Sequence, residues 1–250
     1  MIEEKEIHEK RTAEKNYEGM ADVAGEILFG RLSRPFDEKL YQMAMDLLEE
    51  AVKAGNATAM CNYGAVFYNG IGTPQDMDKA VYWYGRAAGL GDRTAISNMG
   101  YMHYYGRGPL CVDMEKAYRF FSKAALLGDP SAVYKCGDMY LKGQYVGKDE
   151  KTAFSLYCSA FRIVSEEKPL SAYPDICRRI ATCLHKGLGV EIDLQTARNL
   201  MAEAVGGFEQ RLQSGDRFTQ GVLAAARAEL EEIESELAYT RVLIGQDDEE

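Results

Sequence analysis

One stretch of this sequence returns at a fixed interval and decides the fold: Ala59-Met-Cys-Asn-Tyr-Gly64-Ala-Val-Phe-Tyr-Asn-Gly70. It aligns with the stretch from Ala95 to Gly106 at an offset of 36 residues, and with the stretch from Ala132 to Gly143 at a further 37. A period of this length is typical of repeat architectures, in which each unit is one supersecondary structure. The sequence therefore predicts a chain of stacked repeats.

A second pattern follows each of these stretches and completes the unit. An aspartate is followed four residues later by an alanine and seven residues after that by another, as in Asp76, Ala80 and Ala87. The aspartates that begin this pattern are Asp76, Asp113, Asp149 and Asp193. Ala44 and Ala51 keep the same spacing, so we expect the array to begin before the first full unit.

The fourth unit is weaker than the others and arrives late. It runs from Ile176 to Ala204, has Ala181 where the other units have their first glycine, and starts 44 residues after the third unit. Two prolines among the extra residues indicate a loop insertion at 163–174.

Two antiparallel helices account physically for each unit. A glycine such as Gly64 inside the first helix lets a neighbouring helix approach closely, and a glycine such as Gly70 ends that helix in the left-handed cap conformation. Asp76 and its equivalents suit the N-cap of the second helix, where the carboxylate accepts free backbone amides. One hairpin cannot bury its own apolar face, so we predict an all-α solenoid of antiparallel helix-hairpin repeats.

The repeat pattern resembles a known family. Its fullest version comprises Gly70-Ile-Gly72, Asp76, Ala80, Trp83-Tyr84 and Ala87-Ala88-Gly89-Leu90-Gly91. This pattern is similar to that of the Sel-one-like repeat (SLR) family, relatives of the tetratricopeptide repeats, and the resemblance covers about residues 21–205. It implies a right-handed α/α superhelix with a concave inner face, which that family uses in scaffold and adaptor roles. His103 for a tyrosine and Cys136 for a leucine are local departures from the family pattern.

Both ends of the chain differ from the repeats. We expect a charged segment at 1–16 and an acidic tail at 246–250. Between them we expect repeats over 17–205 and capping helices over 206–245. The repeats comprise a partial first unit and full units that start near 59, 95, 132 and 176. An apolar stripe at helical spacing marks the last helix at Leu223, Ala226, Leu230, Ile233, Leu237 and Ile244. The stripe fits a helix that caps the last repeat, and its spacing also fits a homodimer seam.

Charge and composition exclude several classes of protein. A net charge of −10 disfavours nucleic acid and anionic membrane surfaces, because phosphate binding needs clustered Lys and Arg. The charged start of the chain and the absence of a long apolar run predict no membrane insertion and a cytoplasmic location. The six cysteines are scattered without metal-ligand spacing, so we predict reduced thiols rather than disulfides.

The motifs that resemble catalytic or cofactor sites have a simpler explanation. Gly70-Ile-Gly72 and its equivalents follow a helix and lack the third glycine of a dinucleotide fingerprint, so they indicate turns. The three histidines are far apart and none stands at ligand or triad spacing. We therefore predict no cofactor, no metal and no enzymatic activity.

The informative variation lies at positions of the first helices that the repeat leaves unconstrained, because these face the inner groove in related solenoids. The groove is predicted to be rich in tyrosine at its centre and basic toward the fourth unit. Tyrosine and arginine often dominate interface energy, and arginine can bind a carboxylate through two hydrogen bonds. The predicted contact residues are Asn98, Tyr101, Tyr104, Tyr105, Tyr134, Lys135, Arg178, Arg179 and His185. The alternative is that these side chains only pack between adjacent hairpins.

The function predicted from these features is a scaffold or adaptor that binds a peptide or protein segment in its groove. An enzyme or enzyme inhibitor that acts on peptide or cell-wall fragments is one alternative. A structural module that self-associates through the C-terminal helix is another.

Overall fold

The structure is a computed structural model that describes residues 16–29, 37–166, 168–169, 171–216 and 218–247, with side chains described up to residue 240. Within these residues the regular secondary structure is entirely α-helical, which confirms the predicted all-α class. Nearly all of the segment 1–16 and the last three residues of the tail lie outside the described residues. The chain divides into two compact units, residues 1–129 (unit 1) and 130–250 (unit 2).

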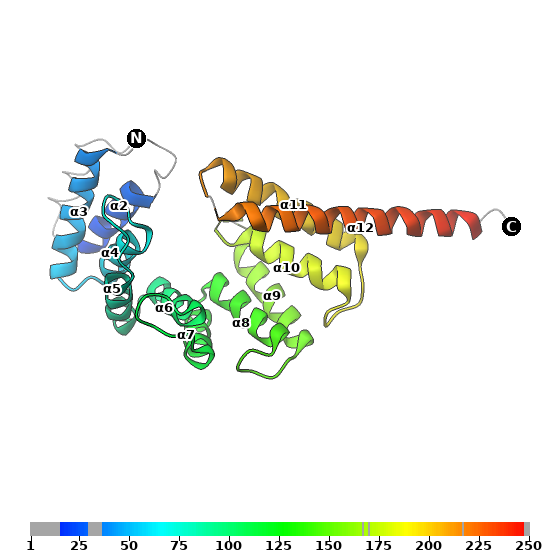
Figure 1. Cartoon of the computed structure of the whole chain (residues 1–250), viewed down its shortest axis with the longest axis horizontal. Coiled ribbons are helices and arrows are strands. Elements are labelled where there is room, and N and C mark those ends of the chain that lie inside the picture. The colour runs from blue at the N-terminus through cyan, green and yellow to red at the C-terminus, as the bar shows by residue number, and fades with distance from the viewer. Residues whose placement is uncertain (1–15, 30–36, 167, 170, 217, 248–250) are drawn as a thin grey trace. The chain divides into compact units, whose positions relative to one another are not determined.

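The described residues of unit 1 form three antiparallel helix hairpins (Figure 1). In each hairpin the two helices pack on each other, and successive hairpins meet through α2 and α4 and through α5 and α6. The helices are α2 (Tyr17–Phe29) with α3 (Glu38–Lys53), α4 (Ala57–Asn69) with α5 (Met77–Gly89), and α6 (Arg93–Tyr105) with α7 (Met114–Leu126). The α2–α3 hairpin precedes the first stretch that repeats clearly in the sequence.

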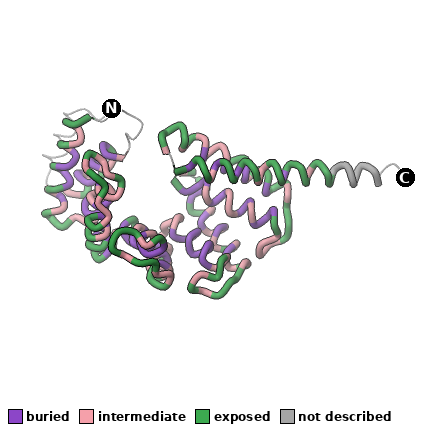
Figure 2. Tube along the Cα trace, in the orientation of Figure 1, coloured by how far each residue is buried: buried purple, intermediate pink, exposed green. Residues whose placement is uncertain are grey.

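Unit 2 contains two hairpins and a long last helix. The hairpins are α8 (Pro130–Lys142) with α9 (Glu150–Val164), and α10 (Tyr173–Lys186) with α11 (Leu194–Gln213). The last helix, α12 (Thr219–Asp247), packs along α11 and also touches α10. Leu223, Ala226 and Ile233 of its stripe are buried, whereas the surface becomes mostly exposed further along the helix (Figure 2). Ile244 lies outside the described side chains, and self-association through α12 stays a prediction.

The ends of the helices follow the chemistry that the sequence predicts. Asp76 begins α5 as its N-cap, and its Oδ1 accepts a hydrogen bond of 3.0 Å from the backbone N–H of Lys79. Asp113, Asp149 and Asp193 cap α7, α9 and α11 in the same way. Gly70 ends α4 with φ at 66°, a left-handed conformation that glycine adopts without steric cost.

The glycines inside the first helices face aromatic rings. A Cβ atom added to Gly64, Gly100 or Gly137 would lie 2.9 Å, 2.6 Å or 2.6 Å from a ring carbon of the second helix of the same hairpin. Those rings belong to Tyr84, Phe121 and Tyr157, respectively. The sequence predicts close approach of a helix backbone at these positions, but the space is filled by a side chain. In the fourth unit, Ala181 replaces the glycine and the buried Met201 stands where the ring would be.

Candidate functional site

In unit 1 the predicted contact residues lie on α6. The Tyr101 and Tyr105 rings stack with their centroids 6.4 Å apart and their planes 8° apart. The centroids of the Tyr104 and Tyr105 rings are 4.9 Å apart, with the rings edge to face. The Tyr104 side chain is buried. Asn98 is half-buried one turn earlier, and its Nδ2 lies 4.0 Å from the Sγ of Cys61 on α4.

A pocket of about 330 Å³ opens between α4 and α6, and we call it the Tyr84 pocket. Its lining residues are Ala65, Tyr68, Asn69, Tyr84, Asn98, Tyr101, Met102, Tyr105 and Arg107. Asn98, Tyr101 and Tyr105 of the predicted set are therefore brought together, whereas Tyr104 is not among the lining residues. Arg107 is the charged member of the lining, and its guanidinium carbon lies 5.6 Å from the Tyr105 ring centroid.

Tyr84 lines the pocket, although the sequence indicated it only as part of the repeat pattern and not as a contact residue. It comes from α5, retains 3% of its exposure, and lies against Gly64. Among the described residues none accepts a hydrogen bond from its hydroxyl. Burial, followed by the nearby Cys61 and Tyr68, raises the pKa of Tyr84, so the hydroxyl keeps its proton and can act as a donor. The hydroxyl oxygen is not among the buried side-chain atoms that lack a partner, so it is accessible from the pocket although the rest of the side chain is buried.

In unit 2 three of the predicted contact residues gather around one carboxylate, and we call this group the Asp138 cluster. Arg179 on α10 donates from Nε to Asp138 Oδ1 at 2.7 Å and from Nη2 to Oδ2 at 2.8 Å. The Arg179 guanidinium carbon also lies 4.2 Å from the centroid of the Tyr134 ring. Lys135 Nζ is 3.5 Å from Asp138 Oδ2, and the Tyr157 hydroxyl donates to Oδ1 at 2.9 Å.

The charges of the Asp138 cluster compensate one another. The side chains of Asp138 and Arg179 keep only 10% and 11% of their exposure. Desolvation by burial raises the pKa of Asp138, but the charge and hydrogen bonds of Arg179, together with Lys135 and Tyr157, outweigh it and lower the pKa to about 2. The Asp138 carboxylate is therefore ionised at neutral pH and already occupies the two-bond face of Arg179.

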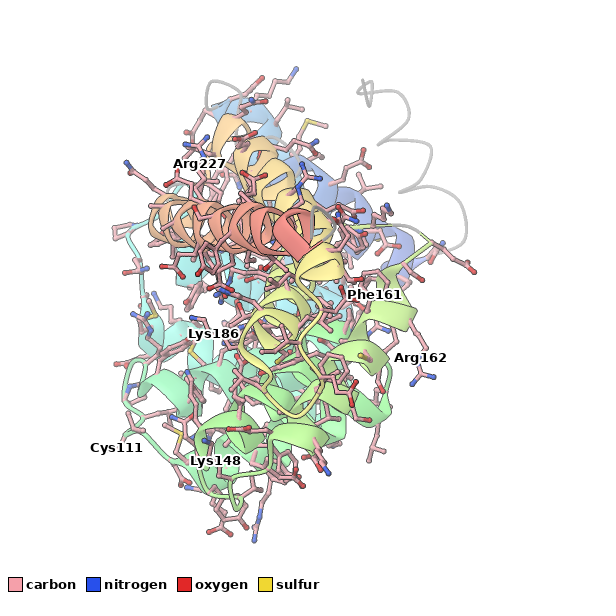
Figure 3. The ribbon with its side chains drawn as sticks, turned by 90° about the vertical axis from the view of Figure 1, so that its right-hand side faces the viewer. Cys111, Lys148, Phe161, Arg162, Lys186 and Arg227 are labelled. Carbon is pink, nitrogen blue, oxygen red and sulfur yellow. The ribbon has the colours of Figure 1, made fainter. Side chains whose placement is uncertain are left out.

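The remaining two predicted residues lie on α10 near α12. His185 is buried, with Nδ1 3.3 Å from Glu229 Oε1 and Nε2 3.3 Å from Glu236 Oε1, both on α12. Lys186, labelled in Figure 3, lies on the same part of α10, with Nζ 3.9 Å from Glu229 Oε1. Arg178 Nε is buried and has no hydrogen-bond partner among the described residues. Desolvation, then the neighbouring Arg179, lowers the pKa of Arg178.

The groups needed for metal or thiol chemistry are not assembled. No cluster of three or more His, Cys, Asp or Glu residues suited to a metal ion occurs in the part of the chain that the structure describes. All six cysteines are described and none forms a disulfide in the structure, with Cys111 at the surface (Figure 3). Burial raises the pKa of Cys177 and of Cys183 to about 12, so both thiols are protonated at neutral pH. Among the described helices, none is long and apolar enough to cross a membrane.

Comparison with known proteins places the fold among solved structures. Four segments, residues 57–92, 94–129, 130–162 and 174–205, match the family model described as Sel1 repeat. A Sel1 repeat protein from Oxalobacter formigenes is 25% identical with a TM-score of 0.61, and the match covers 82% of this chain and 79% of that one. A protective antigen of uropathogenic Escherichia coli strains that displays an SLR fold is 23% identical with a TM-score of 0.60, covering 91% of this chain and 46% of that one. Among curated proteins, none matches this chain.

Proposed function

The chain belongs to the Sel1 repeat family, and on this premise we propose that it is a protein-interaction scaffold that holds a segment of a partner along its first helices. Proteins of this family generally mediate protein interactions, whereas the fold alone does not name a partner. The proposed contact surface in unit 1 comprises Asn98, Tyr101, Tyr104 and Tyr105. In unit 2 it comprises Tyr134, Lys135, Arg178, Arg179 and His185.

The observation that supports this proposal most strongly is the Tyr84 pocket. It is open to solvent, is lined mainly by tyrosine and asparagine, and has the volume to receive one or two side chains. Aromatic rings supply large contact area with few rotatable bonds, so little conformational entropy is lost when a ligand binds. A pocket of this composition suits a side chain that anchors an extended or helical segment.

The surface of unit 2 would contribute in a different way. Arg179 and Lys135 are largely buried and held by Asp138, so a partner would meet only the small exposed parts of a preorganised polar cluster rather than uncompensated cations. Preorganised groups lose little entropy on binding, which favours affinity. No residue cluster in the described part of the chain favours the enzyme or inhibitor alternative. A cytoplasmic location stays a prediction from the sequence.

Selection from a displayed library of random peptides tests the proposal while the partner is still unidentified. The full chain is immobilised, and retained peptides are compared with those retained by the double variant Tyr101→Ala/Tyr105→Ala. Tyr82→Ala is the matched control, because Tyr82 is 56% exposed and is not among the residues that line the pocket. We expect peptides that bind the native chain and the control but are lost on the double variant. Peptides retained equally by all three proteins would contradict the proposal.

A further inference from the structure

In the Asp138 cluster, a carboxylate lies between the first helices of two successive hairpins and accepts hydrogen bonds from its neighbours. Asp138 on α8 receives the hydroxyl of Tyr157 from the second helix of its own hairpin. It receives the guanidinium of Arg179 from the first helix of the next hairpin. One carboxylate therefore links three helices of unit 2 by hydrogen bonds.

The repeat register identifies the same positions in unit 1. Ala65 on α4 stands where Asp138 stands, counted from the repeat starts at Ala59 and Ala132. The remaining equivalences are Tyr84 with Tyr157, Asn98 with Arg179, and Cys61 with Tyr134. The packing follows this register, because Tyr84 lies on Gly64 as Tyr157 lies on Gly137. Asn98 lies against Cys61 as Arg179 lies against Tyr134.

Unit 1 thus keeps the tyrosine donor, has the Asn98 amide in place of the Arg179 guanidinium, and lacks the carboxylate. Ala65, Tyr84 and Asn98 all line the Tyr84 pocket, and by this register the Tyr84 hydroxyl is directed toward the Ala65 position. The Tyr84 side chain is 3% exposed, none of the described residues accepts a hydrogen bond from its hydroxyl, and the hydroxyl oxygen is accessible from the pocket. Arg107 adds a positive charge to the lining, and the lining contains no acidic residue.

We propose that the Tyr84 pocket binds the carboxylate of an aspartate or glutamate side chain of the partner segment. The Tyr84 hydroxyl and Asn98 Nδ2 would donate to the carboxylate in the places of Tyr157 and Arg179, with Arg107 supplying charge. The side-chain source follows from the template, since Asp138 reaches the equivalent point as a side chain. This inference rests on the proposed function, because it names the chemistry of the segment that the scaffold holds.

The test uses blocked amino acids as probes, so the partner itself is not required. Full-length protein with ring-labelled tyrosine is titrated by NMR with N-acetylglutamic acid α-amide, whose only charge is the side-chain carboxylate. N-acetylglutaminamide is the neutral match, and N-acetylglycine offers a terminal carboxylate instead. We expect the glutamate probe to shift the Tyr84, Tyr101 and Tyr105 resonances saturably, and to bind at least about tenfold more tightly than the glutamine probe, because hydrogen bonds to charged groups are the stronger ones.

Two variants locate the site. Tyr84→Phe removes the donor without changing the ring, and Phe121 shows that the repeat accommodates phenylalanine at this position. It should weaken the glutamate probe about tenfold, read from Tyr101 and Tyr105. Ala65→Asp places a carboxylate of the chain itself in the pocket and should abolish binding of the probe. Circular dichroism checks that both variants remain helical.

The possible failures are distinguishable. Equal affinity for the glutamate and glutamine probes, or full binding to Ala65→Asp, would overturn the carboxylate site. Tighter binding of N-acetylglycine would overturn the side-chain source in favour of a chain terminus. If the selected peptides depend on Tyr101 and Tyr105 but tolerate exchange of their acidic residues for amides, the scaffold proposal stands and the carboxylate inference fails. If no peptide depends on those tyrosines, the scaffold proposal fails whatever the probes show.

Discussion

The Asp138 cluster of unit 2 and the Tyr84 pocket of unit 1 occupy equivalent places in the repeat, yet one is filled and the other is open. In the cluster, Asp138 accepts hydrogen bonds from Tyr157 and Arg179. In the pocket, Ala65 and Asn98 stand in the places of Asp138 and Arg179, and a cavity of about 330 Å³ remains. The same helix-hairpin plan thus gives a structural joint in one unit and a concave surface in the other.

If the proposed site is correct, the difference illustrates how a repeat protein can acquire a binding position through side-chain changes in an equivalent register. A short side chain at a joint leaves donors that the repeat still holds in place, because ring and glycine positions are fixed by packing within each hairpin. Such a donor faces an open pocket, where a ligand that supplies an acceptor can replace solvent as its partner. Substitutions that open the cluster or fill the pocket test this comparison directly.

Opening the cluster should have the largest effect. Asp138→Ala removes the carboxylate that Arg179 and Lys135 share. Among the described residues, it leaves Arg179 with only the longer 3.4 Å contact to a carboxylate, that of Asp175, and breaking a buried pair typically costs about 3 to 5 kcal/mol. Urea unfolding followed by circular dichroism measures the loss. Asp149→Ala, which removes only the N-cap of α9, is the control and should cost about 1 kcal/mol. A loss for Asp138→Ala no larger than that of the control would show that the cluster contributes little to stability.

Protonation of Asp138 at low pH should lower the stability of the chain by less than Asp138→Ala does. The pKa of Asp138 is lowered from 3.8 to about 2 in the folded chain, so its contribution to stability is fully present above about pH 4 and is lost as pH falls toward 2. A shift of this size corresponds to about 2 kcal/mol. The measurement is the unfolding free energy between pH 5 and 2 for the native chain and for Asp138→Asn, in which the capping aspartates still titrate. If the two curves fall in parallel over this range, Asp138 is not the group responsible.

A matched pair of tyrosine substitutions compares the Asp138 cluster with the Tyr84 pocket directly. Tyr157→Phe removes a hydrogen bond to a buried carboxylate and should cost about 1.5 kcal/mol. Tyr84→Phe removes a hydroxyl that no described residue accepts, so it should change stability by less than about 0.5 kcal/mol, the range of substitutions that remove no such feature. Thermal or urea unfolding of the two variants gives the comparison. Equal losses would mean that the Tyr84 hydroxyl already has an equivalent partner.

The parts of the fold that depend on local sequence could be predicted. The Asp76 and Gly70 equivalents fix helix ends through bonds to residues a few positions away, and the repeat period shows which hairpins follow one another. The partner of Gly64 was not predictable in the same way, because spacing shows that a small residue is needed but not whether a backbone or a ring fills the space. Tyr84 does so in the structure.

The sequence could predict which positions belong to the candidate site. It could not predict which of their side chains are already paired with other residues of the chain. Periodicity places Asn98, Tyr101 and Arg179 on the face of the first helices that is predicted to line the groove, but whether each is exposed or already paired depends on residues far away in sequence. Arg179 pairs with Asp138, 41 positions before it. Ala65, Tyr101, Asp138 and Thr182 occupy equivalent positions in the four units, and Asp138 is the single acid among them. This single acid was the sequence signal that could have indicated a partner for Arg179.

A small coupling should come from rebuilding the cluster inside the pocket. Ala65→Asp alone adds a carboxylate that faces the Tyr84 hydroxyl and Asn98, and Asn98→Arg alone adds a cation without its partner. Together they restore the pair that Asp138 and Arg179 form, so a double-mutant cycle should give a favourable coupling of about 1 kcal/mol. The coupling should be smaller than in unit 2, because Cys61 stands where Tyr134 supports Arg179. A coupling near zero, measured by urea unfolding, would mean that equivalent positions in the two units are not geometrically interchangeable, and the template for a bound carboxylate would be lost with it.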